Sequence, residues 1–266
     1  MSGLRIWVQG VGLLGPGLSS WAASLDVLRG AQALASAPTV LPVPARLPPA
    51  ERRRAGAAVK LALAVADEAV AQARLDPALL ATVFTSSSGE GANCHALCET
   101  LATPAPMVSP TRFTNSVHNA AAGCWHIAVG SRASSTSLCA FDGSFGAGLI
   151  EAATSVALSG APMLLVASDS PYPEPLARTR PLPDHFGLAL LLTPTETAQS
   201  IAGLSIELVG TDRSASTCDD AALEGLRRVV PAAAALPLLV ALARGGAPGT
   251  VVLDYLDATR LRVELG

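Results

Sequence analysis

The sequence has a single lysine, few aromatic residues and little charge of either sign. Lys60 is the only lysine among 18 basic residues, aromatic residues make up 4% of the 266 residues, and charged residues make up 15%. The formal net charge is −3, and the one basic cluster, residues 52–54, is as short as an ordinary solvated helix start. We therefore expect no nucleic-acid partner.

Long apolar segments and paired cysteines are also missing. The longest apolar region, residues 229–243, is interrupted by Pro231 and Pro237. It is shorter than the roughly 20 residues that a helix needs to cross a bilayer. The N-terminus has no stretch typical of a secretory signal. Five cysteines, an odd number without framework spacing, indicate reduced thiols. Together these absences predict a cytoplasmic protein without a membrane segment.

Apolar residues are abundant, at 50% of the sequence, which is enough for a large buried core. Strand-like runs that are apolar throughout are typical of a sheet covered on both faces, so we predict a layered α/β fold. No repeat or linker divides the chain, and we expect one domain over residues 1–266. The expected strands are residues 5–11, 82–85, 135–141, 162–167, 187–192 and 206–209, with a hairpin or edge strands at the C-terminus. The expected helices are residues 20–28, 51–74, 95–103, 116–129, 144–158 and 219–230.

The segment SLCAFDGSFGAG, residues 137–148, joins an expected strand to an expected helix. With the strand that follows, it predicts a βαβ crossover of paired parallel strands. A cysteine at the tip of such a turn would gain reactivity from the helix N-terminus. The residue there is Asp142, which is a poor acyl carrier but a favoured N-cap. The sequence therefore predicts the environment of a nucleophile with a helix cap in its place.

Two other motifs suggest ligand sites. GVGLLG, residues 10–15, fits a dinucleotide-binding pattern, but Pro16 and Gly17 interrupt the helix that should follow, and we expect the glycines to end a strand. Cys94, His95 and Cys98 have no second ligand pair at the spacing of zinc motifs. We expect neither a nucleotide cofactor nor a metal.

An enzyme that uses Ser144 or Cys139 stays open as an alternative. The sequence DGSFG around Ser144 resembles a nucleophile elbow, but Asp142 replaces the glycine that lets such a turn close. A serine nucleophile also needs a base, and His118, in SVHNAAAG, is the histidine in the most distinctive context. Nothing in the sequence places His118 near Ser144. This alternative would be a stand-alone thiolase-like acyltransferase or hydrolase.

Several segments, in order along the chain, carry a resemblance to a known family. They are IWVQGVGLLGPG with SSWAASLDVLRG, RRRAGAAVKLALAVADEAV with TVFTSSSGEG, residues 109–152, and APMLLVASDS with HFGLALLLTP. They resemble the β-ketoacyl synthases of the thiolase fold, and most of all their short relatives called chain length factors. The resemblance covers residues 5–193. It implies an α/β/α layered, thiolase-like fold, essentially the N-terminal half of a ketosynthase with a reduced C-terminal part at residues 205–266.

The resemblance also implies a function. Asp142 stands where condensing enzymes have their acyl-accepting cysteine, and no histidine after His185 could supply the pair that assists decarboxylation in active synthases. It therefore implies a non-catalytic subunit that pairs with a catalytic ketosynthase as a heterodimer, in a type II fatty acid or polyketide pathway such as one making aryl polyenes. The subunit would line the tunnel for the growing chain and meet the acyl carrier protein only through the complex.

In the family fold, the strand before the elbow and the preceding loop lie at the dimer interface. His118 could equally be a buried histidine bonded to backbone groups, and Phe141 could be a core residue. The positions that this resemblance makes candidates for the interface or tunnel are Phe113, Thr114, Asn115, Val117, His118, Asn119 and Phe141.

Overall fold

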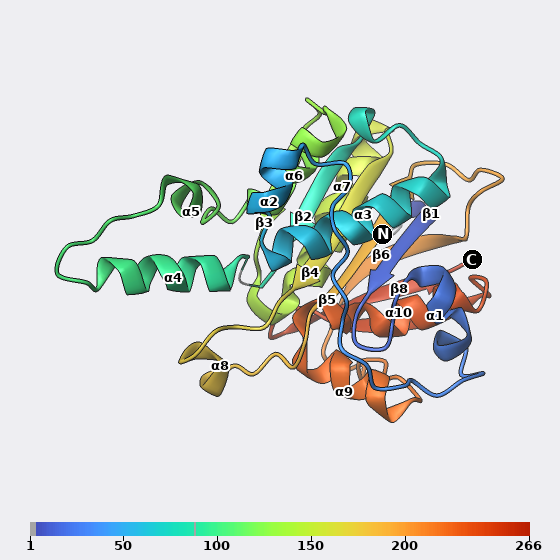
Figure 1. Ribbon diagram of the computed structural model, residues 1–266. Coiled ribbons are helices and arrows are strands. Elements are labelled where there is room, and N and C mark those ends of the chain that lie inside the picture. The colour runs from blue at the N-terminus through green and yellow to red at the C-terminus, as the bar shows by residue number, and fades with distance from the viewer. Residues whose placement is uncertain (1–3, 88) are drawn as a thin grey trace.

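One mixed sheet forms the centre of the computed structural model, which describes residues 4–87 and 89–266 (Figure 1). Within these residues the strand order is β3-β2-β4-β5-β1-β6-β8-β7. β2 pairs in parallel with β3 and β4, whereas β5 is antiparallel to both of its neighbours, β4 and β1. The strands are β1 (Leu4–Leu14), β2 (Ala81–Thr85), β3 (Ser135–Leu138), β4 (Met163–Asp169), β5 (Phe186–Thr193), β6 (Ala202–Gly210), β7 (Gly249–Asp254) and β8 (Thr259–Leu265). Ser88, in the segment TVFTSSSGEG, lies outside the described residues.

Helices cover both faces of this sheet (Figure 1). One face carries α3 (Ala57–Ala73) and α6 (Ala120–Val129). The other carries α1 (Trp21–Leu28), α7 (Ser144–Ser159), α9 (Ala221–Val229), α10 (Leu236–Ala243) and the 3₁₀ helix η3 (Pro231–Ala235). The remaining helices are α2 (Pro49–Arg54), η1 (Pro77–Leu79), α4 (Gly91–Leu101), α5 (Pro110–Thr114), η2 (Phe141–Gly143) and α8 (Leu176–Thr179). None of these described helices combines the length and apolarity that crossing a bilayer requires.

Strand β4 explains why the strand sequences are apolar throughout. Leu164 and Val166 belong to the core beneath α3, whereas Leu165 and Ala167 belong to the core beneath α7. Successive side chains of a strand point to opposite faces, so a strand between two helical layers needs apolar residues at every position. The predicted α/β/α layering is confirmed.

Gly10 and Gly12 of the GVGLLG motif lie inside β1, which continues to Leu14 rather than ending at them, whereas Gly15 directly follows the strand as predicted. A Cβ on Gly10 would lie 2.1 Å from the carbonyl oxygen of Ala69, and one on Gly12 would lie 1.9 Å from that of Val65. Both approaches are too close for any side chain, so the glycines allow α3 to pack directly on the strand. They are not in the loop before a helix that a dinucleotide site requires.

The helix predicted over residues 51–74 is divided into α2 and α3. The chain is extended at Ala55 and Gly56, and α3 begins immediately afterwards. The Oε2 atom of Glu90 accepts a hydrogen bond from the amide of Ala58 at 3.2 Å, so a side chain distant in sequence caps α3. Burial raises the pKa of this Glu90 carboxyl.

The predicted βαβ crossover is correct in strand direction but wrong in pairing. β3 and β4 are parallel, yet β2 lies between them and pairs with both. β3 is also shorter than predicted and ends at Leu138, and its residues are partly or largely exposed because it forms an edge of the sheet. The helices predicted to begin at residues 95 and 116 begin instead at Gly91 and Ala120.

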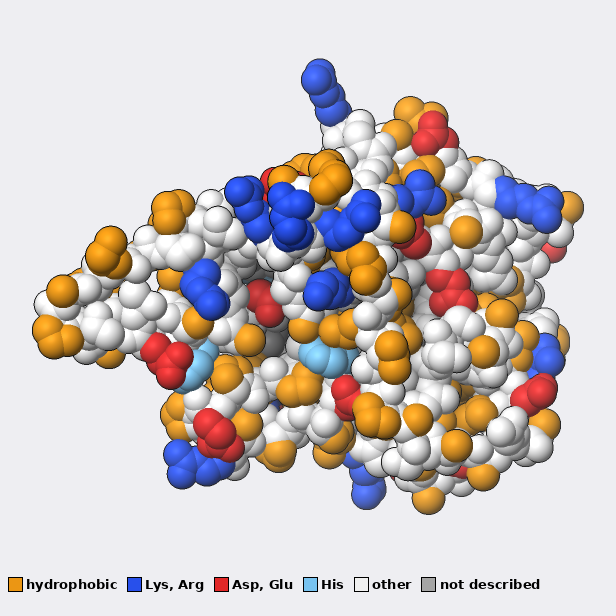
Figure 2. Space-filling model, viewed as in Figure 1, with side chains coloured by type: hydrophobic (Ala, Val, Ile, Leu, Met, Phe, Trp, Pro, Cys, Tyr) orange, Lys and Arg blue, Asp and Glu red, His pale blue; other side chains and the backbone are white. Residues whose placement is uncertain are grey.

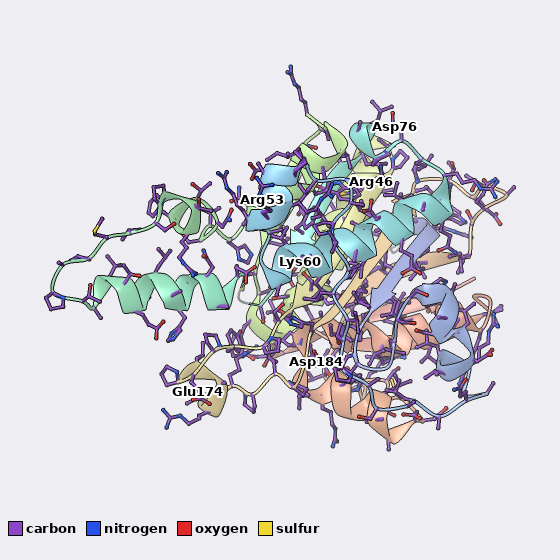
Figure 3. All side chains as sticks on the ribbon, viewed as in Figure 1. Arg46, Arg53, Lys60, Asp76, Glu174 and Asp184 are labelled. Carbon is purple, nitrogen blue, oxygen red and sulfur yellow. The ribbon has the colours of Figure 1, made fainter. Side chains whose placement is uncertain are left out.

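The proline-rich connection between α1 and α2 is bound to the rest of the protein at two points. The amide of Thr39 donates to Asp184 Oδ2 at 2.8 Å, and Arg46 forms an ion pair with Asp67. Figure 3 labels Asp184, Arg46 and also Lys60, which projects from α3. With α3, this connection lines a cleft of about 560 Å³ that includes Lys60.

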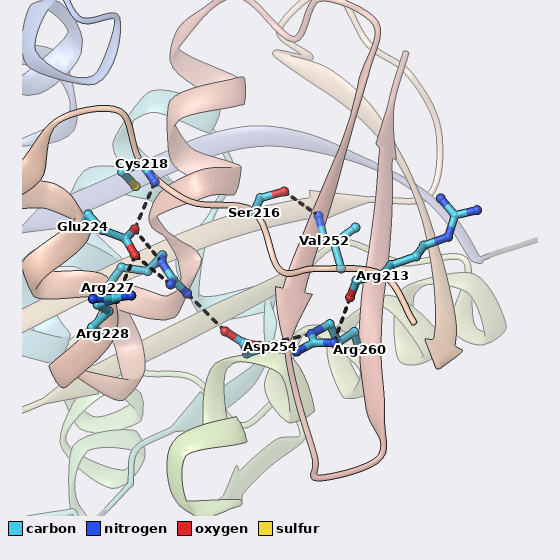
Figure 4. A network of polar contacts seen from close by, with 9 residues as sticks. All are labelled: Arg213, Ser216, Cys218, Glu224, Arg227, Arg228, Val252, Asp254 and Arg260. Carbon is cyan, nitrogen blue, oxygen red and sulfur yellow. Dashed lines mark hydrogen bonds and ion pairs between the residues drawn. The ribbon is translucent and has the colours of Figure 1, made fainter. Parts of the chain in front are cut away.

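The predicted C-terminal hairpin is confirmed as β7 and β8, and β8 also pairs with β6. A network of charges ties the hairpin to α9 (Figure 4). Arg227 contacts Glu224 at 2.7 Å and Asp254 at 3.1 Å, and Arg260 contacts Asp254 at 3.3 Å. The pKa of Glu224 is lowered to about 2, chiefly by its hydrogen bonds with Arg227.

Candidate functional site

The segment predicted to hold the site turns sharply between β3 and α7. Residues 141–143 form the single 3₁₀ turn η2, and α7 begins at Ser144. Phe141 has a φ of 51°, in the left-handed region that bulky L-residues rarely adopt. The strand, turn and helix therefore make the predicted elbow.

The prediction that Asp142 caps α7 is wrong. The N-cap is Gly143, and no side chain forms a capping hydrogen bond there. Asp142 Oδ1 instead pairs with Nη2 of Arg180, which comes from the loop after α8. The guanidinium carbon of Arg180 also lies 3.8 Å from the centroid of the Phe141 ring. The carboxylate at the tip is thus paired with a cation that covers the neighbouring aromatic ring.

Ser144 and Cys139, the alternative nucleophiles, are held by backbone groups. The Ser144 hydroxyl is in a residue only 2% exposed, accepts from the amide of Ala140 at 3.0 Å and donates to the carbonyl of Phe141 at 2.6 Å. The Cys139 thiol lies at the surface and donates to the carbonyl of Ser87 at 3.2 Å. Across residues 4–87 and 89–266, no histidine ring hydrogen-bonds to either side chain. Within the described residues, neither side chain therefore has the hydrogen bond to a histidine base that activates a hydroxyl or thiol.

The C-terminal hairpin packs directly on the elbow. A Cβ on Gly143 would lie 2.8 Å from the carbonyl oxygen of Tyr255, and a Cβ on Gly146 would lie 2.8 Å from the Tyr255 ring. Only glycine leaves room for this approach at either position. The turn between β7 and β8 therefore occupies the space immediately beside the elbow.

Asp169, at the end of β4, is a site-forming residue that the sequence analysis missed. Its side chain is buried, and Oδ1 accepts hydrogen bonds from the amide and hydroxyl of Ser87, both at 2.8 Å. Oδ2 accepts from the amide of Ala232 at 2.8 Å. The carboxylate thus joins the loop after β2 to the start of η3. An acid directly after an apolar strand was the available signal, because buried carboxylates require hydrogen-bond partners.

The residues predicted to face a partner lie at the end of α5, in the connection to α6, and in the elbow. The side chains of Phe113, Val117 and Phe141 are 69%, 50% and 63% exposed. Phe141 is therefore not a core residue. Thr114 and Asn115 bond backbone oxygens of Pro110 and Arg54, whereas Asn119 is the N-cap residue of α6 without a side-chain capping bond.

His118 connects these segments. Its Nε2 lies 3.1 Å from the carbonyl oxygen of Leu138, the last residue of β3. The predicted bond to backbone is confirmed, but the ring is exposed rather than buried. His118 also lines a cleft of about 460 Å³ between α6 and β3, together with His126, Ser135 and Ser137. Among the described strands β3 pairs with β2 alone, so its outer edge is free.

Residues 91–115, which we call the arm, extend away from the sheet and carry α4 and α5 (Figure 1). Figure 2 shows hydrophobic side chains gathered toward its tip. Leu101 is 59% exposed, Met107 88% and Phe113 69%. Large exposed apolar side chains gathered in one region are typical of interaction surfaces.

The candidate zinc ligands Cys94, His95 and Cys98 lie on α4 in the arm. Cys94 and Cys98 are exposed, and His95 Nε2 lies 3.3 Å from Glu99 Oε1. Within the described part of the chain, no three His, Cys, Asp or Glu side chains are grouped to hold a metal ion.

Comparison with known protein families gives one match over most of the chain. The family described as "Beta-ketoacyl synthase, N-terminal domain" matches residues 21–235. A search of curated proteins finds no match.

Several solved structures share the fold over most or nearly all of this chain. A chain of "Ketosynthase (ApeO) in Complex with its Chain Length Factor (ApeC) from Xenorhabdus doucetiae" is 21% identical, with a TM-score of 0.74 over 98% of this chain and 99% of that one. A chain of "The ishigamide ketosynthase/chain length factor" is 14% identical, with a TM-score of 0.75 over 98% of this chain and 99% of that one. A ketosynthase from Burkholderia phymatum is 14% identical, with a TM-score of 0.63 over 87% of this chain and 71% of that one. The layered architecture is therefore the thiolase-like fold of ketosynthases.

Proposed function

Because the chain belongs to the β-ketoacyl synthase N-terminal domain family, we propose that it is a non-catalytic subunit of the chain-length-factor type. It pairs with a catalytic β-ketoacyl synthase in the cytoplasm and shapes the tunnel for the acyl or polyene chain, in a type II fatty acid or polyketide pathway such as an aryl polyene pathway. The observation that carries this proposal is the ketosynthase-type elbow whose tip is a carboxylate paired with Arg180.

The chemistry of condensation explains the weight of that observation. The growing chain must be transferred to a nucleophile as an acyl intermediate, and an arginine-paired carboxylate at the elbow is not such a nucleophile. Decarboxylation of the extender unit draws on the family's histidine pair, and no histidine follows His185 in this sequence. In the proposed complex both roles fall to the ketosynthase, and the acyl carrier protein meets this subunit only through the complex.

The surface around the elbow supports a protein partner. The free edge of β3 offers unpaired backbone donors and acceptors, and strand edges are sites at which a second chain can pair. Phe141 follows this strand closely in the chain, the segment with Val117 meets the strand's end through His118, and the side chains of Phe141, Val117 and Phe113 are exposed. Two of the similar solved structures are complexes of a ketosynthase with a chain length factor, by their own descriptions.

Co-expression with candidate ketosynthases tests the proposal. This chain carries the affinity tag, and the purified material is assayed for a 1:1 complex and for condensation with malonyl-loaded acyl carrier protein. We expect a stable heterodimer whose activity survives Cys139→Ala in this chain and is lost when the ketosynthase lacks its nucleophile. Formation of a homodimer only, with acylation of Cys139 by an acyl carrier protein thioester, would contradict the proposal.

A further inference from the structure

We propose that Arg180 is a positioning residue that holds the Phe141 ring in place for contact with the ketosynthase subunit, and that Asp142 is the anchor for Arg180. We call these three residues the clasp. The inference rests on the proposed function, because it names residues through which the partner would be recognised. It gives the residue at the nucleophile's position a role of its own.

The first step concerns the conformation of Phe141. An aromatic ring that is 63% exposed gains little from the protein's own core, and a φ of 51° is unfavourable for phenylalanine. Such a backbone conformation persists only when surrounding contacts hold it. Arg180 provides one such contact, since its guanidinium carbon lies 3.8 Å from the ring centroid.

The second step concerns how Arg180 is held. Its Nη2 atom pairs with Asp142 Oδ1, and its side chain is only 19% exposed, whereas that of Asp142 is 67% exposed. The Nε atom of Arg180 is buried and has no hydrogen-bond partner among the described residues. A buried donor without a partner costs free energy. Burying this donor therefore does not stabilise the isolated chain. The guanidinium is held there by its ion pair with Asp142 and by its contact with the Phe141 ring.

The third step concerns the place of the clasp on the surface. Phe141 is three residues beyond Leu138, where the free edge of β3 ends. His118, from the segment next to the arm, bonds the same Leu138 carbonyl. The elbow that carries Phe141 thus lies directly beyond the end of β3, where the segment next to the arm also meets the strand, so a chain that pairs along β3 would reach Phe141 next. Because the proposed function pairs this chain with a ketosynthase, we assign the ketosynthase subunit as the occupant.

A double-mutant cycle on the complex tests the clasp. The variants are Phe141→Ala, Arg180→Met and the two together, and the measurement is the dissociation constant of the ketosynthase complex. We expect each single substitution to weaken binding roughly tenfold, the scale of a desolvated cation–π contact. We expect the double variant to bind no more weakly than Phe141→Ala alone, because Arg180 acts through the ring. Additive losses, or unchanged binding by Arg180→Met, would overturn the inference.

Matched controls separate positioning from general damage. Arg178 pairs with Glu174 at 2.9 Å in the same loop region and is 74% exposed, so Arg178→Met removes an equivalent charge without touching the clasp. We expect its complex to bind like wild type. Asp142→Asn should reproduce the loss of Arg180→Met, and Arg180→Lys, which keeps the charge, should recover part of the affinity. If Asp142→Asn binds like wild type, Asp142 is not the anchor.

The unfolding midpoint of each isolated variant provides the remaining distinction. A variant that binds weakly but unfolds like wild type supports positioning, and weak binding matched by an equal loss of stability in every clasp variant overturns it. If the wild-type chain binds no ketosynthase, the proposed function itself fails. If wild type and all clasp variants bind equally, only the clasp inference fails.

Discussion

At the scale of single residues, the elbow has the backbone shape that presents a nucleophile, but its tip carries a paired carboxylate instead. Gly143 and Gly146 keep the close approach of Tyr255 possible, and Ser144 closes the turn with two backbone hydrogen bonds. Asp142 lies at the tip of this turn, where a nucleophile would stand, and its carboxylate is paired with Arg180. Shape and reactivity are therefore separable at this elbow, since the backbone turn does not depend on a thiol.

Restoring a thiol at the tip should not restore condensation. Asp142→Cys places a nucleophile at the elbow, but the chain still has no histidine after His185 to assist decarboxylation. We expect no condensation product when the isolated variant is incubated with acyl- and malonyl-loaded acyl carrier protein and analysed by mass spectrometry. An active ketosynthase under the same conditions is the positive control. Turnover by the isolated variant would show that this chain contains a catalytic base, and it would contradict the proposed non-catalytic role.

At the scale of elements, the hairpin that covers the elbow depends on its attachment to α9. Glu224 and Arg227 on this helix and Asp254 at the end of β7 form a continuous charge network. The pKa of Glu224 is lowered to about 2 from 4.5. The ionised carboxylate therefore stabilises the fold above about pH 4.5, and this contribution is lost as the pH falls toward 2.

Glu224→Gln should make stability less dependent on pH in the acid range. Near neutral pH we expect the variant to lose about 1 kcal/mol of unfolding free energy, the scale of ion pairs near a surface where solvent screens charge. The difference from wild type should shrink toward zero between about pH 4.5 and pH 2, measured by urea unfolding. Asp219→Asn is the matched control, because Asp219 is 95% exposed and pairs only loosely, at 3.6 Å, with Arg244. A constant difference at all pH values would contradict this account.

The comparison with wild type is necessary because other carboxyls act in the opposite direction. Burial raises the pKa values of Asp67, Glu68 and Glu90. Their ionisation therefore opposes folding as the pH rises. The wild-type profile alone combines both effects, whereas the difference between wild type and Glu224→Gln isolates the network on α9.

At the scale of the whole molecule, the free edge of β3, the base of the arm and the elbow make one side of the protein. The arm extends away from the sheet with exposed apolar residues (Figure 1), and the turn of the C-terminal hairpin packs against the elbow. A ketosynthase bound here would cover the residues predicted to line the tunnel. Their bulk would then set the length available to the growing chain.

Larger side chains on this surface should shorten the product of the complex. Val117→Trp and Asn119→Trp add volume at two of the positions predicted to line the tunnel, so we expect shorter chains, measured by mass spectrometry of products released from the co-expressed complex. Leu158→Trp is the control, because Leu158 is 83% exposed near the far end of α7. Product length that stays unchanged across the variants while the complex forms normally would argue against a tunnel lined by this subunit.

The features that the sequence predicts well depend on local pattern. Apolar runs located the strands that are buried on both faces, and the break of pattern at Asp142 located the elbow. The C-terminal hairpin was also correct. These features depend on neighbouring residues and on the period of side chains along a strand, which a single sequence contains.

The features that were missed depend on contacts between residues far apart in the sequence. Where the long helix is divided, Glu90 caps the start of α3. The Asp142 carboxylate pairs with Arg180, which is 38 residues away. The continuation of β1 through Gly10 and Gly12 follows from the approach of α3. Local sequence preferences do not contain these partners. They favour Asp142 as the N-cap of α7, and that prediction is wrong because the N-cap is Gly143.

The short outer strand β3 also affects how the chain behaves while no other chain is bound to it. A long, flat, apolar edge invites pairing with any similar chain and leads to aggregation. β3 spans only Ser135–Leu138, and three of its four residues are serine or threonine. A newly synthesised chain thus presents a small, well-hydrated edge that can persist unpaired in solution. If the chain pairs with a ketosynthase as proposed, production of the two subunits would need no tight coordination in time.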